Sequence, residues 1–158
     1  MLTYPFIDHT FVEPDWIDRN GHMNDAEYAR VFSLAIDHFH DQIGLSTPER
    51  KARNYTVFTL ETHITYLREV EQDHTLDIKV RIYDYDDKRT HFFMELFDTE
   101  TDTLCATGET MMMGIDNETR RAAPYPDDIY EQLAHYYTSQ GKQEWPNQRG
   151  HQIGIPRK

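Results

Sequence analysis

The sequence predicts an α+β fold in which a curved antiparallel sheet of about five strands wraps around one long central helix, with a second helix near the C-terminus. The stretch from Asn24 to Ile43 repeats its apolar residues at the helical period. Four later segments are rich in β-branched and aromatic residues and are separated by short acidic links, which is typical of strands. With 158 residues and 38% hydrophobic content, the chain is large enough to form its own core.

The predicted central helix follows a turn that runs from Asp18 to Asn24. Asn24 and Glu27 have the spacing of a capping box, so we expect the helix to begin there. Gly44 is a natural residue just beyond the helix C-terminus. At ~1.5 Å per residue, the helix is roughly 30 Å long. Its apolar stripe consists of Tyr28, Val31, Phe32, Ala35, Ile36, Phe39 and Ile43.

One short strand is expected before this helix, around Thr10 to Glu13. Four longer strands are expected after it, at residues 55–70, 74–85, 88–98 and 103–115. Because the links between them are short, antiparallel hairpins are favoured over crossovers. Alternation in the first of these strands predicts an apolar face formed by Phe58, Leu60, Ile64 and Tyr66.

The remaining segments suggest one domain with a tail. Residues 46–54 are polar and contain Pro48, so they are expected to form a surface loop. Asp127 to Gln140 has the pattern of a second helix. We therefore expect a single domain over residues 1–140, followed by an irregular tail over residues 141–158. The tail is either a disordered end or a strap that packs on a neighbour.

Composition excludes several classes of function. The single cysteine, Cys105, excludes an internal disulfide and a cysteine-based zinc site, and it favours a reducing compartment. The net charge of -12 disfavours nucleic acid and anionic membranes as partners. No apolar run approaches the ~18 residues of a membrane span, so a cytoplasmic location is expected.

Several common catalytic and metal-binding motifs are also missing. Metal binding is not expected, because His38 and His40 point away from each other on a helix and no His-Glu-x-x-His motif occurs. Neither a Gly-x-Ser-x-Gly elbow nor a P-loop is present.

Three stretches carry a resemblance to a known family: Trp16 to Asn24 (WIDRNGHMN), Leu60 to Glu69 (LETHITYLRE) and Asp87 to Phe93 (DKRTHFF). Together with the order of strand, turn, long helix and four strands, they resemble the hot-dog acyl-CoA thioesterases of the 4-hydroxybenzoyl-CoA thioesterase-like superfamily, over about residues 8–118. They are particularly similar to the thioesterases of carnitine degradation that hydrolyse betainyl-CoA. The resemblance implies a hot-dog fold, an acyl-CoA substrate, no cofactor, and a dimer or tetramer with active sites between subunits.

The resemblance also implies catalytic residues. Asp18 has the position of the acidic residue that acts as nucleophile or as general base for water. His22 and Asn24 belong to the same turn, where His22 either contacts substrate or orients the loop and Asn24 caps the helix. Many relatives carry another acid where this chain has Trp16, so Glu61 is an alternative base. Both acids have plainer interpretations, as a turn residue for Asp18 and a solvated strand residue for Glu61.

The N–H groups at the helix start, near residues 23–25, are expected to form an oxyanion hole, because they are unsatisfied donors at the positive end of the helix dipole. A betainyl group carries a quaternary ammonium, which aromatic faces bind by cation–π contacts. The candidates are Trp16, Tyr28, Tyr66 and Phe92, unless they are ordinary core residues. For the CoA phosphates, the basic candidates are Arg68, Lys88, Arg89, Arg120 and Arg121, unless they are ordinary surface charges.

Two alternatives to a betainyl-CoA thioesterase stay open on the sequence. One is a thioesterase for aromatic or medium-chain acyl-CoA, which is favoured if the aromatic residues line an apolar pocket instead of a cage. The other is a non-catalytic hot-dog module that binds acyl-CoA, in which Asp18 is only a turn residue. Specificity depends on pocket shape, and the candidate residues come from distant segments.

Overall fold

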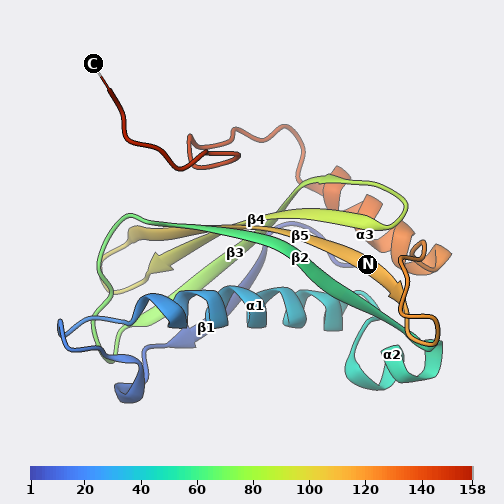
Figure 1. Cartoon of the computed structure of the whole chain (residues 1–158), viewed down its shortest axis with the longest axis horizontal. Coiled ribbons are helices and arrows are strands. Elements are labelled where there is room, and N and C mark those ends of the chain that lie inside the picture. The colour runs from blue at the N-terminus through green and yellow to red at the C-terminus, as the bar shows by residue number, and fades with distance from the viewer. Residues whose placement is uncertain (158) are drawn as a thin grey trace.

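The computed structural model describes residues 1–157 and consists of a five-stranded sheet curved around a long helix (Figure 1). The predicted α+β class and hot-dog architecture are confirmed. In chain order the elements are β1 (Phe6–Phe11), the 3-10 helix η1 (Pro14–Trp16), α1 (Asp25–Gln42), α2 (Thr47–Arg53), β2 (Tyr55–Tyr66), β3 (Thr75–Tyr85), β4 (Arg89–Asp98), β5 (Thr103–Asp116) and α3 (Asp127–Ser139).

The strand order is β1-β3-β4-β5-β2, and each neighbouring pair is antiparallel. Hairpins join β3 to β4 and β4 to β5, as predicted. The predicted hairpin between β2 and β3 is wrong, because β5 and β4 lie between them. The link over residues 67–74 crosses one end of the sheet instead. At ~3.3 Å per extended residue, it easily spans the roughly 14 Å of three inter-strand steps.

A β-bulge at Leu60 changes which residues of β2 share a face. The register of β2 with β5 shifts at this residue, and such an insertion reverses the alternation beyond it. Phe58 pairs with Met113, whereas Ile64 pairs with Gly108. Because these two partners are an odd number of residues apart on β5, Phe58 and Ile64 lie on opposite faces. The predicted common apolar face of β2 is therefore wrong.

The capping box predicted for α1 is present only in part. The Asn24 side-chain oxygen accepts a hydrogen bond of 2.9 Å from the Ala26 N–H, so Asn24 is the N-cap as predicted. Glu27 does not complete a capping box, since it forms an ion pair of 2.9 Å with Arg30.

A capping box forms instead in the segment predicted to be a loop, which contains helix α2. The Glu49 carboxylate accepts hydrogen bonds from the Ser46 N–H at 3.1 Å and from the Ser46 hydroxyl at 2.6 Å. Pro48 lies in the first turn of α2, where its missing N–H costs nothing. The prediction of a loop is wrong because the proline was read as a helix breaker. The first strand also begins earlier than expected, at Phe6.

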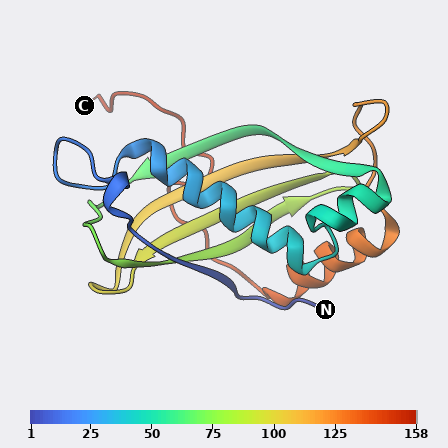
Figure 2. The same ribbon diagram turned by 90° about the horizontal axis from the view of Figure 1, so that it is seen from below.

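Helix α1 packs against the concave face of the sheet, and Figure 2 shows it lying across the strands. The helix comes close to β5 at Gly108, where an added Cβ would lie 2.8 Å from the Phe32 ring. Phe39 of α1 stacks edge-on against Phe92 of β4 at 5.3 Å and against Tyr136 of α3 at 4.9 Å. Residues of both helices and of the sheet therefore share one core.

Beyond α3, residues 141–157 contain no helix or strand and lie on the opposite, outer side of the sheet from α1 (Figure 1). Within residues 1–157, no helix combines the length and the apolar character needed to cross a bilayer.

Candidate active site

A cleft of about 800 Å³ opens at the N-terminal end of α1, where three segments meet. The turn after η1, the first turns of α1 and the end of β2 with the start of the crossover form its walls. We call it the Asp18 cleft. Its lining residues are Asp18, Asn20, His22, Met23, Asp25, Tyr28, Tyr66, Leu67, Arg68 and Glu69.

The turn that carries Asp18 is held by its own backbone. The Asp18 N–H donates to the His22 carbonyl at 3.0 Å, and the Gly21 N–H donates to the Asp18 carbonyl at 3.0 Å. Gly21 has φ of +83°, which favours glycine at this position. The Asp18 Oδ1 atom accepts a hydrogen bond of 2.8 Å from the Asn20 N–H. Within residues 1–157 no hydrogen-bond donor is assigned to Oδ2, which leaves this oxygen for a substrate or a water molecule.

The start of α1 offers fewer free N–H groups than expected. The Met23 N–H donates to the Val70 carbonyl at 2.9 Å, and the Asn24 N–H donates to the Trp16 carbonyl at 2.7 Å. Of the N–H groups of residues 23–25, only that of Asp25 has no assigned acceptor among the described residues. Of the three N–H groups predicted to form an oxyanion hole, the Asp25 N–H is therefore the one that could still donate to a substrate, at the positive end of the helix dipole.

Two tyrosines form the aromatic wall of the cleft. The Tyr28 and Tyr66 rings meet edge to face, with their centroids 5.0 Å apart. Tyr28 is buried, and this burial raises the pKa of its hydroxyl to about 12. The Tyr66 ring is half exposed to the cleft, and its hydroxyl donates a hydrogen bond of 3.1 Å to the Asp25 carbonyl. Desolvation also raises the pKa of Tyr66, so both tyrosines are neutral.

Negative charge outweighs positive charge around these rings. The carboxylates of Asp18, Asp25 and Glu69 line the cleft, whereas Arg68 is its only arginine or lysine among the described lining residues. His22 Nε2 lies 3.0 Å from Glu69 Oε2, so Glu69 orients the imidazole. The carboxylates of Asp25 and Glu69 were not identified from the sequence as part of the site. Asp25 directly follows the expected cap, and Glu69 closes one of the stretches that carry the family resemblance.

The crossover that brings Arg68 and Glu69 to the cleft is tied to the β4–β5 hairpin. The N–H groups of both Leu67 and Arg68 donate to the Cys105 carbonyl, at 2.8 and 3.0 Å. Further along the crossover, His74 Nδ1 lies 2.7 Å from the buried carboxylate of Asp98. This second anchor fixes the far end of the crossover to β4.

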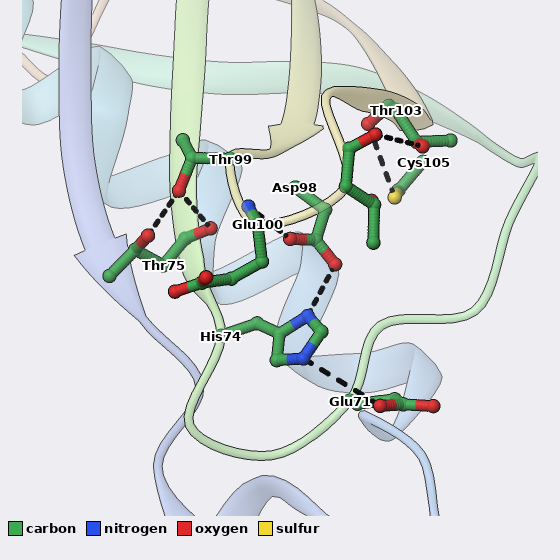
Figure 3. Close-up of polar contacts among 9 residues, drawn as sticks. Glu71, His74, Thr75, Asp98, Thr99, Glu100, Thr103 and Cys105 are labelled. Carbon is green, nitrogen blue, oxygen red and sulfur yellow. Dashed lines mark hydrogen bonds and ion pairs between the residues drawn. The ribbon is translucent and has the colours of Figure 1, made fainter.

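Figure 3 shows the environment of His74, which lies between Asp98 and Glu71. The hydrogen bond to Asp98 raises the pKa of His74, and Glu71, 3.6 Å from Nε2, adds to the effect. A second cavity of about 350 Å³ adjoins this cluster and shares Arg68 and Glu69 with the Asp18 cleft. Arg68 and Glu69 therefore separate the two cavities, and the His74–Asp98 pair lines the second one.

Four predicted catalytic or acyl-binding residues do not line the Asp18 cleft in this chain. One is Asn24, whose side chain caps α1. Glu61 pairs with Met111 and lies on the outer face of the sheet, in a hollow of about 250 Å³ that also contains His63. Phe92 is fully buried under α1, so it is a core residue of this chain. Trp16 packs against the core, and its carbonyl accepts the Asn24 N–H, so it positions the helix start.

The predicted basic residues fall into two groups. Arg68 is in the Asp18 cleft. Lys88 and Arg89 lie at the β3–β4 turn, and Arg120 and Arg121 follow β5, so all four are at the opposite end of the sheet. Arg89 is held by Asp86, with Nε 2.8 Å from the carboxylate. In a single chain, the second group does not meet the cleft. Among residues 1–157, no cluster of three or more His, Cys, Asp or Glu side chains is arranged to hold a metal ion.

Comparisons with known proteins agree with this geometry. Residues 12–133 match the model of the thioesterase-like superfamily. A betainyl-CoA thioesterase of Pseudomonas aeruginosa is 31% identical over 147 residues, which cover 93% of this chain and 92% of that protein. A Staphylococcus aureus protein solved in complex with CoA has a TM-score of 0.93 and 43% identity, covering 99% of this chain and 98% of that one. A putative thioesterase from Pseudomonas putida has a TM-score of 0.83 and 32% identity, with 99% of each chain covered.

Proposed function

Because this chain belongs to the thioesterase-like superfamily and is a hydrolase of acyl-CoA thioesters, we propose that its substrate is betainyl-CoA, which it cleaves to betaine and CoA. The observation that carries this proposal is the combination of an aromatic pair and an excess of carboxylates in the Asp18 cleft. The P. aeruginosa relative has the same named activity. On this proposal the chain serves carnitine degradation. We also propose a cytoplasmic location, which suits the free thiol of Cys105.

The cleft suits a trimethylammonium group for two reasons. The exposed Tyr66 ring offers a π-face, and the buried Tyr28 ring packs against Tyr66 in an edge-to-face contact. A quaternary ammonium donates no hydrogen bonds, so it gains from π-faces and from nearby negative charge without needing an acceptor. The surrounding carboxylates of Asp18, Asp25 and Glu69 supply that charge. An aromatic or aliphatic acyl group would gain nothing from them.

In the proposed reaction, the thioester carbonyl carbon lies near Asp18, and its oxygen accepts a hydrogen bond from the Asp25 N–H. Either the Asp18 carboxylate attacks the carbon directly, or it removes a proton from a water molecule that attacks. The C–S bond then breaks, and the electron pair leaves with the CoA sulfur, which takes up a proton. In the first case, water hydrolyses the mixed anhydride in a second step. His22, oriented by Glu69, is the residue suited to supply the proton that the CoA sulfur takes up.

Binding of the CoA phosphates is proposed to require a second copy. Strand β2 is an unpaired edge of the sheet, and Phe58 and Leu60 on it are exposed. Antiparallel pairing of two β2 strands about a two-fold axis would bring the Tyr66 end of one chain next to the Tyr55 end of its partner. The partner's Arg120 then approaches the cleft, and with Arg68 it supplies positive charge for the phosphates. Sedimentation equilibrium measures the molar mass of the assembly and so distinguishes a dimer from a tetramer of two such dimers.

The substrate proposal is tested with a neutral isostere. In 3,3-dimethylbutanoyl-CoA a carbon atom replaces the nitrogen of betainyl-CoA, so the shape is kept and the charge is lost. Initial rates of CoA release are measured for both, beside acetyl-, benzoyl- and octanoyl-CoA. We expect a KM for betainyl-CoA lower by about 5- to 30-fold than for the isostere, as one or two cation–π contacts allow.

The positive charge of betainyl-CoA also makes its carbonyl more reactive than that of the neutral isostere. A variant therefore separates recognition of the charge by the protein from this intrinsic reactivity of the substrate. Tyr66→Leu should remove most of the KM preference for the charged substrate, and Tyr137→Leu, a half-exposed tyrosine of α3, should not. A wild-type enzyme with equal KM values for the two substrates contradicts cation recognition, and so does a Tyr66→Leu variant that keeps the preference.

A medium-chain substrate is the second candidate, and one feature favours it. A crevice of about 300 Å³ lies between α1 and β2, and Phe32, Ile36 and Met112 contribute apolar walls. A chain of several methylene groups would fit such a crevice. In the substrate panel, a kcat/KM for octanoyl-CoA above that for betainyl-CoA would support this candidate.

A further inference from the structure

The C-terminal tail crosses the sheet in a defined direction. Its start is fixed at β3, where the Gln140 side chain exchanges two hydrogen bonds with the Ile82 backbone, at 2.7 and 2.9 Å. Arg81, which is 5% exposed, donates to Gln143 Oε1 at 3.0 Å and to the Glu144 carbonyl at 2.8 Å. Buried charged groups in such contacts hold a segment firmly in place.

The next contacts move step by step toward the other edge. The Trp145 ring stacks edge-on against Tyr83 of β3 at 5.0 Å and against Phe93 of β4 at 5.9 Å. The Gly150 N–H then donates to the Glu109 carboxylate of β5 at 2.7 Å. Finally the His151 ring lies 6.2 Å from that of His63 on β2. The order β3, β4, β5, β2 is the order of the strands in the sheet.

The tail therefore leaves the molecule at the free edge of the sheet, next to β2. Figure 2 shows it passing behind the sheet from the α3 side and emerging on the β2 side. We call residues 152–157, which lie beyond His151, the terminal arm.

The terminal arm presents apolar residues to solvent. Ile153 is 84% exposed and Ile155 is 73% exposed, the highest values among the large apolar residues described. They are two positions apart, so in an extended segment they share a face. Neither contacts its own chain's core. A segment held in place by Arg81 and Glu109 that then exposes two isoleucines is typical of an arm whose partner surface belongs to another molecule.

We propose that the terminal arm of each chain packs on the outer face of a second copy of this chain, across the paired β2 edges. The inference rests on the dimer described above, because only that dimer continues the outer face beyond β2. Phe58 of β2 lies on this face and stays partly exposed, although the Arg120 guanidinium of the same chain lies 5.0 Å from the centre of its ring. The Phe58 ring of the second copy is the apolar group that the two isoleucines would cover.

Charge supports the same partner. Residues 141–158 contain Lys142, Arg149, Arg157 and Lys158 against the single acid Glu144, whereas the whole chain has a net charge of -12. The body of the protein is therefore strongly acidic and the tail is basic. An arm of this kind is attracted to the body of another copy, and the attraction decreases as salt is added.

The arm is tested with a pair of matched variants. Ile153→Asp with Ile155→Asp adds two charges to the apolar face, and Gln152→Asp with Gly154→Asp adds the same two charges to the opposite face. Sedimentation equilibrium should show the dimer dissociation constant raised by about 100-fold in the first variant and much less in the second, as expected for losing two buried isoleucines. A chain that ends after His151 keeps the contacts that residues 140–151 make with its own sheet, and it should behave like the first variant.

A cross-link identifies the surface. In a Cys105→Ser background, chains carrying Ile155→Cys are mixed with chains carrying Phe58→Cys, so any disulfide between these positions joins different chains. Chains with Glu13→Cys, at the opposite side of the sheet, are the control partner. We expect an efficient cross-link with position 58 and none with position 13.

The outcomes separate the arm from the dimer. In one outcome the wild type is a dimer, the two double variants have the same dissociation constant and no cross-link forms between positions 155 and 58. That result overturns the arm and leaves the β2 dimer intact. A wild-type monomer at micromolar concentration overturns the dimer and the arm together. Betainyl-CoA hydrolysis by the wild type is measured separately and tests the substrate alone.

Discussion

The Tyr66 hydroxyl donates a hydrogen bond of 3.1 Å to the Asp25 carbonyl, and so joins the end of the edge strand β2 to the first residue of α1. Both elements contribute to the walls of the Asp18 cleft. The bond therefore fixes the width of the cleft at the point where the Tyr66 ring faces the proposed acyl group. It also orients the peptide that links Asp25 to Ala26. The N–H of Asp25 itself has no assigned acceptor within residues 1–157.

Removing only this hydroxyl should loosen the cleft without removing the ring. For Tyr66→Phe we expect a KM for betainyl-CoA raised by about 2- to 10-fold, which corresponds to one lost hydrogen bond. The preference over the neutral isostere should persist, because the π-face remains. Steady-state kinetics on both substrates measure the two quantities. Tyr137→Phe on α3 is the matched control, and a loss of charge preference in Tyr66→Phe would contradict the division of roles.

Asp18 is expected to act on the reacting atoms. Asp18→Asn keeps an oxygen that can accept the Asn20 N–H, so the turn should survive. Loss of the carboxylate should lower kcat by roughly 10²- to 10⁴-fold, the usual contribution of a general base or nucleophile. Asp15→Asn in the exposed helix η1 is the control. If Asp18→Asn lowers the melting temperature and leaves kcat unchanged, Asp18 is only a turn residue.

Local patterns were enough to predict most of the fold. The period of α1, the Asn24 cap and the α3 pattern depend on neighbours in sequence, and these elements were correctly predicted. The failures involve distant partners. No local signal says that β2 pairs with β5 and not with β3, and the bulge at Leu60 is defined only by its register with β5. Helix α2 is an exception, because the Ser46 and Glu49 pair was visible in the sequence.

The site shows the same limit. The turn carrying Asp18 and His22 was visible because it is continuous in sequence and directly precedes a helix. Glu69 joins it only because the crossover returns to the turn through the hydrogen bond from Met23 to Val70. Phe92 and Tyr66 look alike as strand aromatics, yet one is fully buried and the other half exposed. Burial depends on the curvature of the sheet around α1, which no short motif encodes.

The anchor of the crossover should depend on pH. The carboxylate of Asp98 raises the pKa of His74 above 6.5, so the folded state binds this proton more tightly than the unfolded state does. The stabilising effect is complete below about pH 6.5 and is lost as the pH rises through the folded pKa. His74→Asn should therefore destabilise the protein more at pH 6 than at pH 9.

Urea unfolding at the two pH values measures this difference for wild type and His74→Asn. His9, which pairs with Asp77 at 2.6 Å on exposed strand surface, gives the control His9→Asn. An exposed pair contributes little, so this control should change stability little at either pH. An equal loss at pH 6 and pH 9 for His74→Asn would show that the charge on His74 does not anchor the crossover.

His40 should have the opposite pH dependence. It is buried in α1 next to Phe39 and Phe92, with ring centroids 6.1 and 5.7 Å away, and this burial lowers its pKa to about 3, with a smaller contribution from Arg50. The folded state therefore holds His40 neutral where the unfolded state protonates it. Its contribution is complete above about pH 6.5 and is lost as the pH falls toward 3.

Between pH 6.5 and pH 5, this one residue should cost the wild type roughly 2 kcal/mol of unfolding free energy. His40→Leu removes the proton-binding group and also the buried Nδ1 atom, which has no hydrogen-bond partner among the described residues. The variant should thus be about as stable as the wild type at pH 7 and more stable at pH 5. Urea midpoints across this range measure the slope, and His135→Leu, exposed on α3, should keep the wild-type slope. The same acid sensitivity in His40→Leu would mean that other groups, such as the paired carboxylates, cause the loss.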